Sequence, residues 1–273
     1  MMKKIINIQA SCTNKKYSAF FKKSEMVVVC CIMLLALAGC DIIPGFGSSK
    51  RVLFIGNSYT NTANIPTVFA ELAASGGHKV EVGIGADKGG SFAAYAQSVA
   101  VRETMQSSKW DFVVLQEQSQ LPSNASLRPS TMYPPARELV RQIRSIGATP
   151  VFFQTSGNRN GWPENGLPGY ENMQLEIIQG YSEIAQELQV PVAPLGYAWS
   201  VAMKNIPQLN PWMDDRHPNE QGAYLAACIF YATLFRESPE GVRYTANLPK
   251  YLAKKLQIIA ADAVLQNLQR WNL

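Results

Sequence analysis

One stretch of the chain decides the fold: Val52-Leu53-Phe54-Ile55-Gly56-Asn57-Ser58. A short, continuous apolar run that ends in a polar turn is typical of a strand covered on both faces of a sheet. The turn places the Ser58 hydroxyl at the carboxyl edge of that sheet. Further runs of the same kind predict strands at Val80–Ile84, Phe112–Leu115, Pro150–Gln154 and Val190–Pro194.

Helical periods separate these strands. They predict helices at about Ile65–Ala74, Phe92–Gln106, Tyr133–Ile146 and Tyr170–Leu188, then at Ala198–Lys204, Glu220–Phe235 and Lys250–Gln269. Alternating strands and helices predict an α/β fold with a parallel sheet and helices on both faces. Ligands of such sheets bind beyond the carboxyl ends of the strands, so we look for chemistry in the loops that follow them.

The charge of the chain is concentrated at its start. Of the 25 basic and 20 acidic residues among 273, six lysines and one glutamate lie before Cys40, so 19 residues of each sign remain. The rest of the chain is therefore neutral, and we expect no nucleic-acid partner. A hydrophobic fraction of 47% also excludes a disordered chain.

The basic start leads into an apolar run, Met26–Ala38, that is shorter than the about 20 residues of a spanning helix. This pattern is typical of a secretory signal. Leu37-Ala38-Gly39-Cys40 resembles the lipobox of bacterial lipoproteins, which implies cleavage before Cys40 and lipidation of its thiol. We therefore expect a signal peptide at 1–39, a lipidated cysteine and tether at 40–50, and a domain at 51–273 held to a membrane of the bacterial cell envelope, facing the periplasm or the outside. The alternative is a signal anchor that is not cleaved.

The sequence contains few residues that could bind a metal ion or a cofactor. Four of the five cysteines belong to the signal or the anchor, and Cys228 lies in an apolar stretch where we expect a buried, unreactive side chain. With two histidines in the chain, a zinc site is not expected, and there is no phosphate-binding glycine loop. We expect no metal and no cofactor.

Three residues can together form a nucleophilic site. A serine hydroxyl needs a base, and histidine oriented by a carboxylate is the usual one near neutral pH. His217 lies in Asp214-Asp215-Arg216-His217-Pro218, where Asp214 can reach back to the imidazole. The other histidine, His78, reads as an exposed turn residue.

The Gly-Asn-Ser turn after the first strand and the Asp-x-x-His block near the carboxyl end resemble the SGNH (GDSL-like) serine hydrolases. This resemblance, over about 51–235, implies a three-layer α/β/α fold with five parallel strands. It also implies that Ser58 is the nucleophile, His217 the base and Asp214 its partner, with Asp215 as the alternative to Asp214.

The resemblance further implies an oxyanion hole built from the serine N–H, a glycine and an asparagine. Gly90 fits the glycine. The third strand, however, ends in Leu115-Gln116-Glu117-Gln118-Ser119 instead of Gly-x-Asn-Asp. Either Gln118 or Gln116 can supply the missing amide, and register favours Gln118.

Aromatic and amide side chains in the loops suit sugar rings, and we expect Trp162, Trp212 and Tyr59 to contact substrate. The resemblance then implies an esterase that removes acetyl or other small acyl groups from carbohydrate or another small ester. The alternatives are a lipase or thioesterase of the same fold, and an inactive glycan-binding module.

Overall fold

Five parallel strands form the central sheet of the computed structural model, which describes residues 49–85 and 90–273. The predicted signal segment and Cys40 lie outside these residues. The strands follow the order β2-β1-β3-β4-β7, so the strand that leads to Ser58 lies inside the sheet. Their bounds are β1 Lys50–Ile55, β2 Val80–Ile84, β3 Phe112–Leu115, β4 Thr149–Phe153 and β7 Val192–Ala193. The predicted α/β class and the three-layer arrangement are confirmed.

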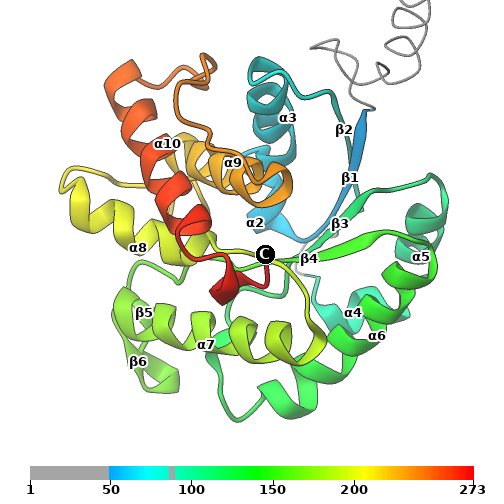
Figure 1. The fold of residues 1–273 in the computed structure, drawn as a ribbon. Coiled ribbons are helices and arrows are strands. Elements are labelled where there is room, and N and C mark those ends of the chain that lie inside the picture. Colours follow the sequence, from blue (N-terminus) through cyan, green and yellow to red (C-terminus); the bar gives the residue numbers. More distant parts are fainter. Residues whose placement is uncertain (1–48, 86–89) are drawn as a thin grey trace, which may run out of the picture. The chain divides into compact units, whose positions relative to one another are not determined.

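Helices cover both faces of the sheet (Figure 1), and successive strand residues pack into two different cores. In β1, Val52 and Phe54 pack into one core, while Leu53 and Ile55 pack into the other. The first core is covered by α3 Ile65–Ser75, α8 Leu195–Asn205, α9 Glu220–Phe235 and α10 Lys250–Leu265. The second is covered by α4 Phe92–Gln97, α5 Val99–Gln106, α6 Tyr133–Ser145 and α7 Tyr170–Leu188. Burial on both faces explains why β1, β3 and β4 are largely apolar, whereas the edge strand β2 is only partly buried.

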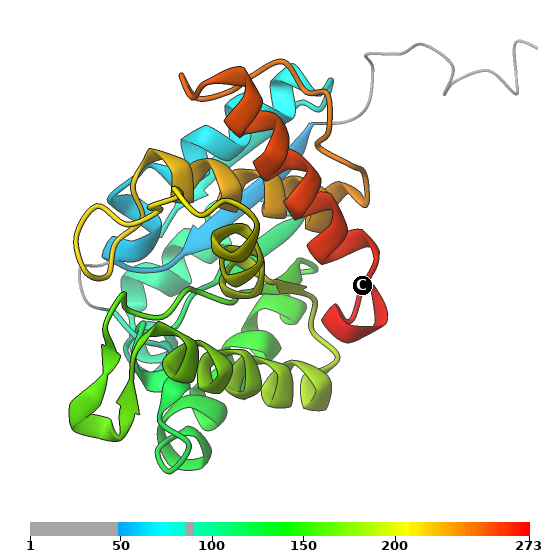
Figure 2. The same ribbon diagram turned by 90° about the vertical axis from the view of Figure 1, so that its left-hand side faces the viewer.

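Three helices differ from their predicted extents, and one of them, α8, begins at Leu195 instead of Ala198. The predicted helix Phe92–Gln106 is two helices, because Ser98 leaves the helical conformation and its hydroxyl accepts the N–H of Val101 to cap α5. The last helix, α10, ends at Leu265 instead of Gln269, and it packs across α9 (Figure 2).

The strand after the fourth helix is also shorter than predicted. Only Val192–Ala193 pair with β4, within the predicted Val190–Pro194. An antiparallel hairpin, β5 Gly161–Trp162 with β6 Leu167–Pro168, interrupts the segment between β4 and α7 and was not expected from the sequence. Among the described residues, no helix is long and apolar enough to cross a membrane.

Candidate active site

Ser58 begins a single helical turn, α2 Ser58–Asn61, directly after β1. Asn57 caps this turn, since its Oδ1 accepts the N–H of Tyr59 at 3.0 Å. Gly56 is required before it, because a methyl group there would collide with the Thr60 hydroxyl. Together these contacts leave the Ser58 side chain partly exposed at the carboxyl edge of the sheet.

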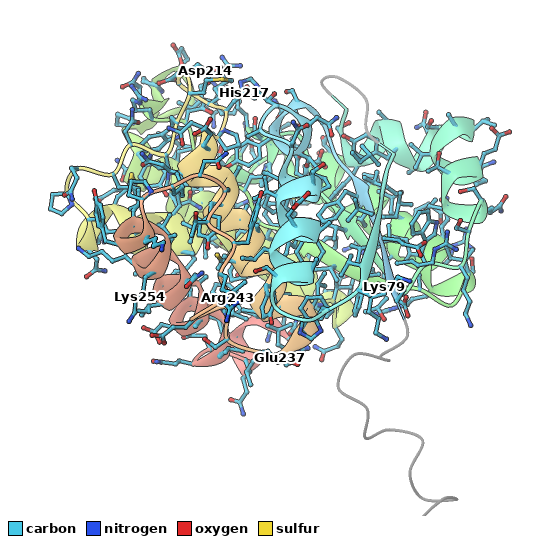
Figure 3. The ribbon with its side chains drawn as sticks, turned by 90° about the horizontal axis from the view of Figure 1, so that it is seen from above. Lys79, Asp214, His217, Glu237, Arg243 and Lys254 are labelled. Carbon is cyan, nitrogen blue, oxygen red and sulfur yellow. The ribbon has the colours of Figure 1, made fainter. Side chains whose placement is uncertain are left out.

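Ser58, His217 and Asp214 form one chain of contacts. Ser58 Oγ lies 3.0 Å from His217 Nε2, and His217 Nδ1 lies 2.7 Å from Asp214 Oδ2. Asp214 and His217 lie together at one end of the molecule, opposite the end that carries Lys79 and Glu237 (Figure 3). The distances are those of a nucleophile, its base and a carboxylate that orients the base.

The Asp214 carboxylate is held in its ionised form. Partial burial alone would raise its pKa, but its Oδ1 accepts the N–H groups of Arg216 at 2.6 Å and His217 at 2.7 Å. With the imidazole contact, these bonds lower the pKa of Asp214 to about 2. The alternative partner, Asp215, bonds instead to Asn160 Nδ2 at 2.7 Å.

Hydrogen bonds hold both ends of the loop that carries His217. Trp212 and Pro218 form a β-bridge, and the Met213 N–H donates to the His217 carbonyl at 2.9 Å. Asn219 then caps α9, because its Oδ1 accepts the N–H groups of Gln221 and Gly222. The imidazole therefore stands on a short closed loop at the start of a buried helix.

Gly90 and Gln118 lie in the loops after β2 and β3, on either side of the serine strand. Within the described part of the chain, no group accepts the backbone N–H of Ser58 or of Gly90. The Gln118 carbonyl Oε1 accepts the N–H groups of Gln120 and Leu121 at 2.9 Å each, while its Nε2 makes only a 3.4 Å contact with Gln120. These donors remain the candidates for the oxyanion hole.

Gln116 does not have the role we considered for it. Its side chain is buried, its Oε1 accepts the Asn57 N–H at 3.0 Å and the Thr60 hydroxyl at 2.9 Å, and its Nε2 donates to the Glu117 carbonyl. Because this side chain is 0% exposed and both ends of its amide bond inside the protein, it does not present an N–H to a substrate. Gln116 instead fixes the turn that carries Ser58.

Solved structures share this architecture, although no family model matches the chain and no curated protein matches it in sequence. A DUF4886 family protein from Bacteroides uniformis aligns with a TM-score of 0.71 and 19% identity over 80% of this chain and 95% of its own. A protein from Slackia heliotrinireducens assigned to the SGNH hydrolases aligns with a TM-score of 0.59 and 25% identity, over 68% of this chain and 100% of its own. The chain has the SGNH hydrolase fold.

An acetylxylan esterase from Geobacillus stearothermophilus, solved as a catalytic variant, has the same fold with a TM-score of 0.51 and 16% identity, over 70% of this chain and 96% of its own. Two of these neighbours, the Slackia protein and the Geobacillus enzyme, are described as a hydrolase and an esterase. They support a hydrolase at the level of the fold.

Two of the three aromatic residues expected to contact substrate are core residues of the SGNH fold. Tyr59 is 2% exposed, and its hydroxyl bonds to Ser156 Oγ at 2.8 Å. Trp212 is 7% exposed and packs edge-on against Tyr170. Their rings close the interior beneath the site, so these two predictions are wrong. Trp162 is partly exposed in β5, and its role stays a prediction.

His78 and Cys228 take no part in the site. His78 is less exposed than expected, because its ring stacks on Phe235 with centroids 3.8 Å apart and contacts Glu237 Oε2 at 3.1 Å. Cys228 is fully buried in α9, and burial raises the pKa of its thiol. Its predicted place in the core is confirmed.

A groove of about 530 Å³ borders the site on the side of His217. Thr62 lies on its wall, and the Thr62 N–H donates to the Ser58 carbonyl at 2.8 Å, one helical turn from the nucleophile. Pro218, which follows His217, also lines the groove. The lining consists of Thr62, Ala63, Asn64, Met213, Pro218, Asn219, Glu220, Gln221 and Leu248.

Proposed function

We propose that the protein is a serine esterase that hydrolyses carboxylic esters. One observation carries the proposal: Ser58 Oγ, the two ring nitrogens of His217 and the Asp214 carboxylate form a continuous chain at 3.0 and 2.7 Å. In a decayed site that only binds glycan, nothing would maintain this alignment.

The chemistry follows from the order of the groups. Ser58 Oγ attacks the ester carbonyl and passes its proton to His217 Nε2, while the Asp214 carboxylate accepts a hydrogen bond from Nδ1–H and stabilises the imidazolium by its charge. The tetrahedral intermediate then expels the alcohol, which takes the proton from Nε2 and leaves an acyl group on Ser58. Water, deprotonated by His217, attacks this acyl-enzyme and releases the carboxylic acid.

Negative charge on the carbonyl oxygen needs donors on the other side of the serine. The N–H groups of Ser58 and Gly90 and the Gln118 side-chain amide are the donors we propose. Each such donor contributes on the order of 3 kcal/mol to stabilisation of the transition state.

The groove beside His217 supports a carbohydrate as the alcohol part of the ester. Because His217 Nε2 must protonate the leaving oxygen, the alcohol lies on the His217 side of the scissile bond. The groove there has mainly uncharged polar and apolar side chains and a single charged residue, Glu220. Hydroxyl groups of a sugar can bond to such amide and hydroxyl side chains, and its C–H faces can rest on exposed Met213. We propose acetyl or similarly small acyl groups on carbohydrate as the substrate class.

Ser58→Ala tests the activity. We expect it to abolish hydrolysis of p-nitrophenyl acetate and labelling by a fluorophosphonate probe, while Ser145→Ala, an exposed serine on α6, keeps both. Mass spectrometry of the labelled wild-type protein should locate the probe on Ser58. Unchanged turnover in Ser58→Ala would remove the proposal.

We also propose that the chain is held to a bacterial membrane by a lipid on Cys40, within the cell envelope. The support is the sequence Leu37-Ala38-Gly39-Cys40 at the end of a basic and apolar leader. Expression in a bacterium fed a palmitate analogue should label the wild-type chain and not Cys40→Ser. Equal labelling of both chains would contradict the anchor.

A further inference from the structure

Glu117 is a buried carboxylate at the end of β3 that the proposed chemistry does not use. Its side chain is 0% exposed, and a single oxygen, Oε1, accepts the N–H of Phe92 at 2.9 Å and the N–H of Gln118 at 2.7 Å. We infer that Glu117 is a positioning residue that holds the oxyanion donors in place for ester hydrolysis. This inference rests on the proposed function.

The two N–H groups belong to the two loops that flank the nucleophile. Phe92 begins α4 two residues after Gly90, and Gln118 carries the side-chain amide of the proposed oxyanion hole. In the strand order β2-β1-β3, these loops follow the strands on either side of the serine strand. One carboxylate oxygen therefore joins the two loops that must present their donors to the same oxygen of the substrate.

Hydrogen bonds continue from Glu117 back to the serine turn. The Glu117 carbonyl accepts Gln116 Nε2, Gln116 Oε1 accepts the Asn57 N–H, and Asn57 Nδ2 donates to the Gly90 carbonyl at 3.1 Å. With the bond from Phe92 to Glu117, these contacts link the loop after β2, the serine turn and the end of β3. Donors fixed in this way need no reorganisation when charge develops, which is the source of their effect on rate.

The other carboxylate oxygen shows that stability alone does not account for this residue. Glu117 Oε2 is buried and accepts no hydrogen bond from any described residue. A buried carboxyl group with an unsatisfied oxygen is costly for folding, and features that cost stability concentrate at functional sites. The arrangement is understandable if Oε1 serves the site.

Three substitutions of Glu117 distinguish the effect of its hydrogen-bond acceptor from the effects of its charge and of its side-chain length. Glu117→Leu removes the acceptor, Glu117→Gln keeps an oxygen that can accept both N–H groups, and Glu117→Asp withdraws the carboxylate by one methylene. Gln154→Leu is the matched control: Gln154 is also 0% exposed, lies directly after β4, and its Oε1 accepts the Tyr197 N–H at 3.2 Å, away from the oxyanion loops. For each folded variant, kcat and KM for p-nitrophenyl acetate and the rate of fluorophosphonate labelling of Ser58 are measured.

We expect Glu117→Leu to lower kcat at least about tenfold with KM within twofold, and to slow labelling in proportion, because donors that act on the transition state affect kcat. Glu117→Gln should keep kcat within about threefold, and Gln154→Leu should keep the wild-type kcat. If Glu117→Leu does not fold, Glu117→Asp is the test in its place, and we expect it to show the same loss of kcat at constant KM.

Wild-type kcat in folded Glu117→Leu, or an equal loss in Glu117→Leu and Gln154→Leu, would overturn the inference and leave the proposed esterase intact. A wild-type protein that neither hydrolyses esters nor reacts with the probe would overturn both.

Discussion

Asp214 shows how much one residue sets the state of the base. Its pKa of about 2 means that the carboxylate is ionised near neutral pH, where it accepts hydrogen bonds from His217 Nδ1–H and from two backbone N–H groups. Asp214→Asn keeps the shape and removes the charge that stabilises the imidazolium. We expect kcat at pH 7 to fall by about three to four orders of magnitude.

Asp215→Asn is the control for that loss. Its carboxylate bonds to Asn160 and not to the imidazole, so we expect kcat to stay within a few-fold of the wild type. Similar kcat values in the two variants would show that Asp214 is not the partner of His217.

A second prediction at the level of single residues concerns how Glu117 affects the stability of the protein. Burial raises its pKa from 4.5 to about 7, although hydrogen bonds from Gln118 and Phe92 oppose the shift. In the unfolded chain the carboxyl group ionises near 4.5, whereas in the folded chain it stays protonated until near 7. Glu117 therefore makes a contribution to the free energy of unfolding that is fully present below pH 4.5. This contribution is lost as the pH rises from 4.5 through 7.

Glu117→Gln carries no such titration. We therefore expect its free energy of unfolding, relative to the wild type, to be higher at pH 8 than at pH 4 by about 3 kcal/mol. Urea unfolding of both proteins at the two pH values measures this difference. An unchanged difference between the proteins at both values would contradict the raised pKa of Glu117.

At the scale of elements, α9 and the loop before it act as one unit. Asn219 caps the helix with Oδ1 and holds the preceding loop with Nδ2, which donates to the carbonyls of Asn210 and Trp212 at 2.6 and 3.3 Å. Asn219→Ala should lower the free energy of unfolding by about 1–2 kcal/mol through loss of the cap. It should also lower kcat, because His217 stands in the loop that Asn219 fastens.

Asn219→Asp separates these effects, since it keeps a capping oxygen and loses the Nδ2 donor. Urea unfolding and kcat are compared for both variants, and we expect Asn219→Asp to regain most of the stability without the full kcat. Full recovery of kcat would show that the cap alone positions the loop.

The elements also show what the sequence could predict. The strands, and helices such as Tyr170–Leu188 and Glu220–Phe235, carry strong apolar patterns, and their predicted places are close to those observed. The break at Ser98 was missed because a serine inside a helical period does not reveal whether its hydroxyl caps a new helix. The β5–β6 hairpin has only two residues in each strand, which is too short for a periodic pattern.

The catalytic residues could be predicted from the sequence because few residues of the required type are present. The residues whose role depends on tertiary packing could not. With two histidines, His217 was nearly the only possible base. Tyr59 and Trp212 lie close in sequence to Ser58 and His217, at the edge of the sheet where substrate is expected. Packing against residues distant in the sequence nevertheless buries both rings. Gln116 and Gln118 differ by two positions at the end of one strand, and only tertiary contacts show that Gln116 is used up inside the protein.

At the scale of the whole molecule, two grooves of about 530 Å³ offer a comparison. One borders His217; the other lies between α7 and α8 and includes exposed Leu175. Thr62→Trp fills the first groove. If that groove holds the sugar, we expect kcat/KM for an acetylated xylooligosaccharide to fall at least about fivefold more than kcat/KM for p-nitrophenyl acetate.

Leu175→Trp fills the second groove and should leave the ratio of the two substrates unchanged. Initial rates on both substrates measure the ratio. A fall in the ratio for Leu175→Trp and not for Thr62→Trp would assign the sugar to the groove between α7 and α8.

The pairing of Ser58 with His217 joins residues 159 positions apart, which makes reactivity a late property of a growing chain. During synthesis the strand that leads to Ser58 is complete long before the ribosome has made α9. Until then the hydroxyl has no base, because His78 lies before β2, at the amino edge of the sheet, where it comes to stack on Phe235. A chain that ends before His217 therefore lacks the base of the proposed site, and the pairing that we propose activates Ser58 forms only with the last quarter of the protein.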